Sequence, residues 1–163
     1  EIWFNAGAGH DGWMTAVGNM FRKIGLPYKL RGNLQFNEFL SKRDAKEMTG
    51  PFRLAWVMDY PSIENFLAPQ FATAALAPAG SNTTFYSSPA FDDALNAGDR
   101  APTIEAASLA YEKAENVLVQ DLPATPLFCG LDQAVWDKRV SGVGYNILGE
   151  IELADVVVDG EAV

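Results

Sequence analysis

Short apolar runs alternate with helix-like segments along the first third of the chain. Ile2–Phe4 is an apolar run that ends at a glycine-rich stretch, and it predicts a short strand. Between Trp13 and Ile24 the apolar residues recur mostly at spacings of three and four, which predicts a helix that stops at Gly25. Residues 28–31 alternate between apolar and charged side chains, so they predict a strand with one face toward water.

The same alternation continues for one more helix and one more strand. Apolar residues between Phe36 and Met48 predict a second helix, which Gly50 and Pro51 close. Residues 53–58, with the sequence RLAWVM, have the length and composition of a buried strand. This strand–helix–strand–helix–strand order predicts an α/β fold with parallel strand pairs and right-handed crossovers.

The second half of the chain predicts more helix and fewer clear strands. Residues 72–84 are small and polar, and they predict a long surface loop. A short helix is predicted at 89–95, and a longer one at 103–120, where apolar side chains recur along one side. Further strands are predicted at 127–130, 134–136 and 154–158, and no internal repeat is found.

The charge of the chain narrows the range of partners. The 163 residues carry a formal net charge of −9, whereas sequence-independent binding to nucleic acid needs a basic surface that neutralises phosphates. We therefore expect no nucleic-acid partner. Eight of the twelve basic residues lie between Arg22 and Arg53, whereas residues 150–161 hold five acids and no base, which indicates two solvated faces of opposite sign.

Few residues of the chain have side chains that suit catalysis or metal binding. Cys129 is the only cysteine, so no intrachain disulfide forms, and its apolar neighbours favour a buried hydrophobe over a nucleophile. His10 is the only histidine, which excludes metal sites with two histidine ligands. Asp59 and Glu64 are more typical of a loop than of a catalytic carboxylate pair. We expect no catalytic residue and no resident metal or cofactor.

Two features of the chain as a whole concern its cellular context. No apolar run approaches the roughly 20 residues that span a bilayer, and no basic-then-apolar signal segment opens the chain. Glu1 leads directly into a strand-like run without an initiator methionine. We therefore expect the chain to be a piece of a longer protein.

Gly7, Gly9 and Gly12 fit the pattern G-x-G-x-x-G between a predicted strand and a predicted helix. In this context the glycines of a dinucleotide-binding fold admit a pyrophosphate to the helix N-terminus. In that fold an acid about 20 residues after the glycines binds the ribose 2′-OH of the cofactor. Here the corresponding position holds Arg31, which would favour a 2′-phosphate, so an NADP-dependent oxidoreductase domain is one alternative function. The other interpretation is an ordinary strand-to-helix turn, because the helical spacing begins at Trp13, after the third glycine.

Asp59 follows the third predicted strand and is flanked by Trp56 and Tyr60. In α/β sheets ligands gather beyond the carboxyl ends of strands, so Asp59 is a candidate for ligand binding. The alternative is that Asp59 caps the turn into the next helix. Trp56 likewise is either the wall of a pocket or a core residue, whereas Asn65 and Phe66 are expected to be structural.

The order of three segments resembles a known family. The segments are FRLAWVMDYPSIENFL, FYSSPAFDDAL and AYEKAENVLVQDLPATPLF. They resemble the extracytoplasmic peptide-binding proteins of ABC importers, the oligopeptide and dipeptide family. In that family three motifs follow one another along the chain. They are a strand end with G-W-x-x-D-Y-x-D-P-x-N-F, a helix with Y-x-N/S-P-x-F-D and a helix ending in E-D/Q-D-x-P. The opening IWFNAGAGHDGW looks like the start of that family's C-terminal lobe, which explains the glycines without a nucleotide. Ala55 and Ser62-Ile63 depart from the pattern, so the ligand class stays open.

The resemblance implies a fold and a cellular role. The fold would be α/β and of the type II periplasmic-binding-protein kind, a single lobe with a mixed sheet flanked by helices. Residues 1–163 would form the C-terminal lobe of a two-lobed protein, with the chain after about residue 140 running back toward the missing N-terminal lobe. That lobe would carry the signal sequence and lipid anchor. The whole protein would capture its ligand outside the cytoplasm and deliver it to ABC permease subunits.

The resemblance implies a role for Asp59, and the chemistry and position of other residues suggest roles for them. Asp59 would pair with the α-amino group of a bound peptide or of a similar amine-bearing solute. Trp56 would form the wall of a side-chain pocket, Tyr60 would add a hydroxyl, and Phe128 would line the cleft. Arg53 shares strand parity with Asp59 and would receive a ligand carboxylate, or it would be a solvated arginine. An interaction module, with an apolar surface open to partners, is the remaining alternative.

Overall fold

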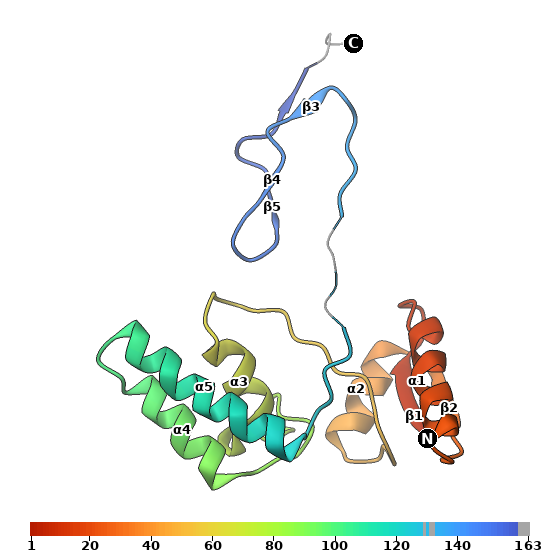
Figure 1. Cartoon of the computed structure of the whole chain (residues 1–163). Helices are drawn as coiled ribbons and strands as arrows, with labels where there is room; N and C mark the ends of the chain where they lie inside the picture. The colour runs from red at the N-terminus through yellow and green to blue at the C-terminus, as the bar shows by residue number, and fades with distance from the viewer. Residues whose placement is uncertain (129, 131–132, 160–163) are drawn as a thin grey trace. The chain divides into compact units, whose positions relative to one another are not determined.

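The computed structural model describes residues 1–128, 130 and 133–159, which divide into two compact units. The first unit comprises residues 1–56 and 69–89, and the second comprises residues 57–68 and those from 90 onward. Figure 1 shows that helices and short strands occur in both units. The α/β class predicted from the sequence is therefore confirmed.

The first unit contains two parallel strands and two helices. β1 (Ile2–Asn5) pairs in parallel with β2 (Leu30–Leu34), and α1 (Asp11–Lys23) connects them. α2 (Phe36–Asp44) follows β2, so the order predicted for this part of the chain is confirmed. β2 begins two residues later and ends three residues later than the alternating stretch at 28–31 indicated.

A small core holds β1 and α1 together. Ile2, Phe4 and Met14 are buried, and half-buried apolar side chains pack against them. Gly32 on β2 makes room for the Phe4 ring, because a Cβ at this position would lie 2.1 Å from the ring. Gly18 on α1 does the same for another aromatic ring, that of the tyrosine at position 28.

Two helix ends differ from their predicted positions for local reasons. α1 begins at Asp11, which places Gly12 in its first turn and leaves open space where a Cβ would be. α2 ends at Asp44 instead of Met48, because Lys46 adopts a left-handed conformation with φ of 60°. Glycine usually occupies such a position at a helix end, so the sequence offered no signal for it.

The third predicted strand is the main error of the sequence prediction. Phe52 makes an isolated parallel bridge to Trp3, and the amide of Arg53 donates to the Trp3 carbonyl at 3.0 Å. Residues 54–58 form no strand, and Val57 is 76% exposed. The reason is that β1 ends at Asn5, so the apolar run has no further backbone to pair with.

The predicted loop at 72–84 is only partly a surface loop. It contains a short 3-10 helix, η1 (Thr73–Ala75), and Asn82 in it is completely buried. The Asn82 amide donates to the carbonyls of Ala72 and Tyr86 at 3.0 and 2.9 Å. A buried amide that closes the loop on itself explains why this small, polar segment is ordered.

Three helices form the central part of the second unit. α3 (Glu64–Phe71) starts there and runs into the first unit, and α4 (Pro89–Asp99) and α5 (Ile104–Asp121) follow. Both predicted helices are confirmed, although α4 extends four residues beyond the predicted end. The hydroxyl of Thr103 caps α5 by accepting a hydrogen bond from the amide of Ala106 at 3.2 Å.

The C-terminal part of the second unit contains short antiparallel strand pairs. β3 (Val140–Ser141) pairs with β6 (Val157–Val158), and β4 (Gly144–Tyr145) pairs with β5 (Ile151–Glu152). The strand predicted at 154–158 is thus shorter than expected. The described residues of 127–130 and 134–136 form no strand, because no other strand pairs with them, and Cys129 lies outside the described residues. In the described part of the chain, no helix is long and apolar enough to cross a membrane.

Candidate ligand-binding site

Asp59 lies at a corner of the second unit just before α3. Its amide donates to Oδ1 of Asn65 at 2.8 Å, and Nδ2 of Asn65 approaches Oδ2 of Asp59 at 3.5 Å. Asn65 itself is only 2% exposed, whereas Asp59 is exposed. The corner therefore consists of an exposed carboxylate whose backbone is fixed by a buried amide.

The turn between Asp59 and α3 is closed by its own hydrogen bonds. The amide of Ser62 donates to the Tyr60 carbonyl at 2.8 Å, and the hydroxyl of Ser62 accepts from the amide of Glu64 at 3.2 Å. The Ser62 hydroxyl therefore supplies the acceptor for the first amide of α3, a task that the alternative interpretation assigned to Asp59. Asp59 takes part in the turn mainly through its backbone, which leaves its carboxylate for other contacts.

The hydroxyl of Tyr60 contacts residues of the same corner. It donates to the carboxylate of Glu64, and this hydrogen bond is the largest of the effects that raise the pKa of Tyr60. A side-chain hydrogen bond with Asn65 acts in the opposite direction on this pKa. Asn65 thus contacts both Asp59 and Tyr60, a role that the sequence did not indicate.

In the part of the chain that the structure describes, no cation pairs with the Asp59 carboxylate. The ion pairs that do form involve other acids, at positions 1, 44, 47 and 137. An exposed carboxylate with fixed backbone and no counter-charge can accept charge-assisted hydrogen bonds from an ammonium group.

Arg53 occupies a different environment in the first unit. Its Nε donates to Oδ1 of the buried Asn5 at 3.2 Å, and its side chain is half-buried. Burial lowers the pKa of the Arg53 guanidinium, and repulsion from Arg43 adds to this. Among the described residues no carboxylate pairs with Arg53, so both roles considered for it, a partner of a ligand carboxylate and a solvated arginine, stay predictions.

His10 adds a second donor near Arg53 that the sequence analysis did not assign to a site. Its Nδ1 accepts a hydrogen bond from the indole of Trp13 at 3.3 Å, so the proton of the neutral ring is on Nε2. Nε2 is buried and has no hydrogen-bond partner among the described residues. Burial lowers the pKa of His10, and the charge of Arg53 lowers it further, while Asp11 opposes both. A neutral N–H donor and a guanidinium without an ion-pair partner among the described residues are groups suited to an anion.

The remaining predicted site residues lie as follows. Trp56 is half-buried and is the last residue of the first segment of the first unit. Phe128 belongs to the second unit and is 67% exposed. The structure therefore brings together Asp59 and Tyr60, and separately Arg53 with Asn5 and His10.

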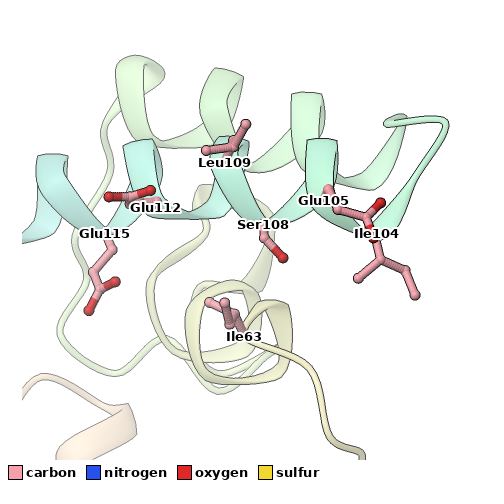
Figure 2. Close-up of a pocket in the computed structure, with 7 residues that line it drawn as sticks. All are labelled: Ile63, Ile104, Glu105, Ser108, Leu109, Glu112 and Glu115. Atoms are coloured by element: carbon pink, nitrogen blue, oxygen red, sulfur yellow. The ribbon is translucent and has the colours of Figure 1, made fainter.

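A groove along α5 is a concave surface of the second unit. It has a volume of about 690 Å³ and is lined by Ile63, Ile104, Glu105, Ser108, Leu109, Glu112 and Glu115. Figure 2 shows Ile63 facing the Ser108 side of α5, with Glu112 and Glu115 farther along the helix. None of the residues predicted to bind ligand lines this groove. In the described residues no group of three or more His, Cys, Asp or Glu side chains could hold a metal ion.

Local geometry explains two of the three glycines of the G-x-G-x-x-G pattern. Gly7 and Gly9 have φ of 75° and 71°, a conformation that side chains disfavour and that the turn after β1 requires. A Cβ at Gly12 would meet no atom within 4 Å, so no close packing requires a glycine at this position. The oxidoreductase alternative finds no support, and the turn interpretation accounts for Gly7 and Gly9, whereas nothing in the geometry requires a glycine at position 12.

Known proteins resemble the chain in sequence and in fold. No family model matches it. The periplasmic murein peptide-binding protein MppA of Escherichia coli K12 is 27% identical over 129 residues, which cover 77% of this chain and 22% of that protein. The chain thus spans about a fifth of the length of this curated relative.

Solved structures extend the comparison. The structure of Escherichia coli MppA matches with a TM-score of 0.66 and 25% identity, over 75% of this chain and 23% of that one. OppA of Haemophilus influenzae in complex with the peptide RPPGFSPFR matches with a TM-score of 0.78 and 24% identity, over 96% of this chain and 30% of that one. These matches confirm the predicted fold of the type II periplasmic-binding-protein kind and come from binding proteins, not enzymes. The resemblance predicted from the order of motifs is confirmed: the chain is related to part of the periplasmic peptide-binding proteins of the oligopeptide and dipeptide type.

Proposed function

We propose that the chain is the C-terminal ligand-binding lobe of a substrate-binding protein that captures peptides or similar amine-bearing solutes for an ABC importer. The name of the relative MppA, a murein peptide-binding protein, supports this class of ligand. Proteins of similar fold hold peptides as well, among them a DppA with the peptide STSA and a dipeptide-binding protein with Met-Leu.

The proposal also covers the cellular location and the partners of the whole protein. It works outside the cytoplasm, as the periplasmic relative does. An N-terminal lobe of the same chain, with a lipid anchor, closes over the ligand, and the permease subunits then receive it. The protein catalyses no reaction, since its task is to bind and release.

The uncompensated carboxylate of Asp59 is the observation that carries the proposal. The α-ammonium group of a peptide would form charge-assisted hydrogen bonds with it. Such bonds become stronger when the lobes exclude water, because the attraction between the charges grows as the local dielectric constant falls. Trp56 and Phe128 would then add apolar contact, and the Tyr60 hydroxyl would add a polar one.

Taken by themselves, Arg53 and His10 of the first unit offer a candidate site for an anion. A guanidinium without a counter-charge and a buried N–H donor would receive a ligand carboxylate.

The substitution Asp59→Asn in the full-length protein tests the proposal. Asparagine keeps the size of the side chain and the backbone bond to Asn65 but removes the charge. We expect affinity for the peptide Ser-Thr-Ser-Ala to fall about tenfold to a hundredfold, the worth of one hydrogen bond to a charged group. Isothermal calorimetry would measure this, with Asp93→Asn, an exposed acid on α4, as the matched control. Equal affinities of the Asp59 variant and the wild type would remove Asp59 from the site.

A further inference from the structure

We infer that Asn65 is a positioning residue that sets the preference of the Asp59 corner for a free amine; this rests on the proposed function. Its side-chain amide has polar contacts with two residues predicted to bind the ligand. Oδ1 accepts the Asp59 amide at 2.8 Å, and Nδ2 lies 3.5 Å from Asp59 Oδ2. The same side chain also lowers the pKa of the Tyr60 hydroxyl.

Burial and a backbone hydrogen bond fix the Asn65 side chain in place. It lies in the first turn of α3 and is 2% exposed, so the surrounding protein holds its rotamer. Its backbone amide donates to the Ser62 carbonyl at 3.1 Å, which ties it to the turn as well. The exposed Asp59 could otherwise rotate freely, and a rotating carboxylate loses entropy when it binds an amine.

The contacts of Asn65 also determine which oxygen of Asp59 faces a ligand. Nδ2 of Asn65 is directed at Oδ2. Oδ1 has no partner among the described residues, so it is the oxygen that an ammonium group would meet first. A buried amide with contacts to an exposed acid therefore orders the site before the ligand arrives, which is the usual way in which preorganisation improves affinity.

The test compares Asn65→Leu with Asn65→Ser in the full-length protein. The probes are Ser-Thr-Ser-Ala and its N-acetyl derivative, which differ only in the charged amine. Leucine has a similar volume but makes no hydrogen bond, whereas serine is smaller and keeps a hydroxyl. We expect the ratio of the two affinities to fall about fivefold to tenfold in Asn65→Leu. A merely structural residue would weaken both probes equally and leave the ratio unchanged.

A second measurement does not need a ligand. The exchange of the Asp59 amide proton with solvent should become faster by about tenfold in Asn65→Leu, while the amides of α5 stay protected. The same amide should remain protected in Asp59→Asn, because that variant keeps the bond to Asn65.

The possible outcomes distinguish a failure of the role of Asn65 from a failure of the proposed function. An unchanged affinity ratio together with unchanged exchange in a folded variant would overturn the role of Asn65 and leave the proposed function standing. A wild type that binds both probes equally would contradict the proposed amine anchor, and the exchange of the Asp59 amide would then decide the role of Asn65 alone. Global unfolding of both variants would show that Asn65 supports the whole unit, which would also overturn the specific role.

Discussion

Gly32 offers a sharp test of the packing in the first unit. A Cβ at this position would lie 2.1 and 2.2 Å from two carbon atoms of the Phe4 ring. Carbon atoms in contact are normally about 3.5 to 4.0 Å apart, so Gly32→Ala requires a displacement of more than about 1 Å. Phe4 is only 1% exposed and packs in the core with Ile2 and Met14, so its ring has little room to move.

The expected cost follows from overpacking. Forcing an extra methyl group into a packed core destabilises the folded state by about 1 to 3 kcal/mol. Replacing glycine by alanine also lowers the conformational entropy of the unfolded chain, which stabilises the folded state by less than about 1 kcal/mol. We therefore expect Gly32→Ala to lower the free energy of unfolding by about 2 kcal/mol. Denaturant unfolding followed by circular dichroism would measure it.

Gly12→Ala is the matched control, because a Cβ there meets nothing within 4 Å. Gly12 lies in the first turn of α1, where alanine is the better helix former, so we expect a gain of up to about 1 kcal/mol. The pair Phe4→Leu and Gly32→Ala should be less destabilised than the sum of the single changes, since the smaller side chain leaves room for the methyl group. If Gly32→Ala unfolds like the wild type, the close packing of β2 on Phe4 is wrong.

Two further predictions concern α5. Thr103→Ala removes the cap of this helix and should cost about 1 kcal/mol in denaturant unfolding, whereas Thr103→Ser should stay close to the wild type. Burial and the neighbouring carboxylate of Asp99 raise the pKa of Tyr111 to about 12. The folded state therefore favours the neutral phenol, and the stability that this supplies is complete below pH 10 and is lost as the pH rises from 10 to about 12. Absorbance titration should show one phenolate that appears late in the wild type and is missing in Tyr111→Phe; a titration without a late step would contradict the raised pKa.

Helices could be predicted from the sequence because their signals are local. α5 matches its prediction within one residue at each end, since Thr103 supplies the cap and the apolar spacing continues to the last turn. The strand predicted at 53–58 failed because a strand needs a partner, and the length of β1 decides whether one is available. The end of α2 at Lys46 failed for a different reason, since a lysine at positive φ carries no mark in the sequence.

The sequence proposes the residues of the candidate site but not their contacts. The end of a predicted strand and the order of motifs indicated Asp59, and strand parity with Asp59 indicated Arg53. The hydrogen bond between Asp59 and Asn65 depends on the path of the turn, which no spacing rule gives. His10 looked like a lone histidine, and only folding shows its buried Nε2 and the influence of Arg53 on its pKa.

The two uncompensated charges differ in what they cost the protein, and this difference bears on function. Asp59 is exposed, so water solvates its carboxylate and the cost is small. Arg53 is half-buried and near the donor His10, and the charge of Arg43 repels it. A cation that is partly removed from water without a counter-charge destabilises the fold. In the proposed function a ligand carboxylate would offset this cost at Arg53, whereas an ammonium group would offset little at Asp59, because water already solvates that exposed carboxylate.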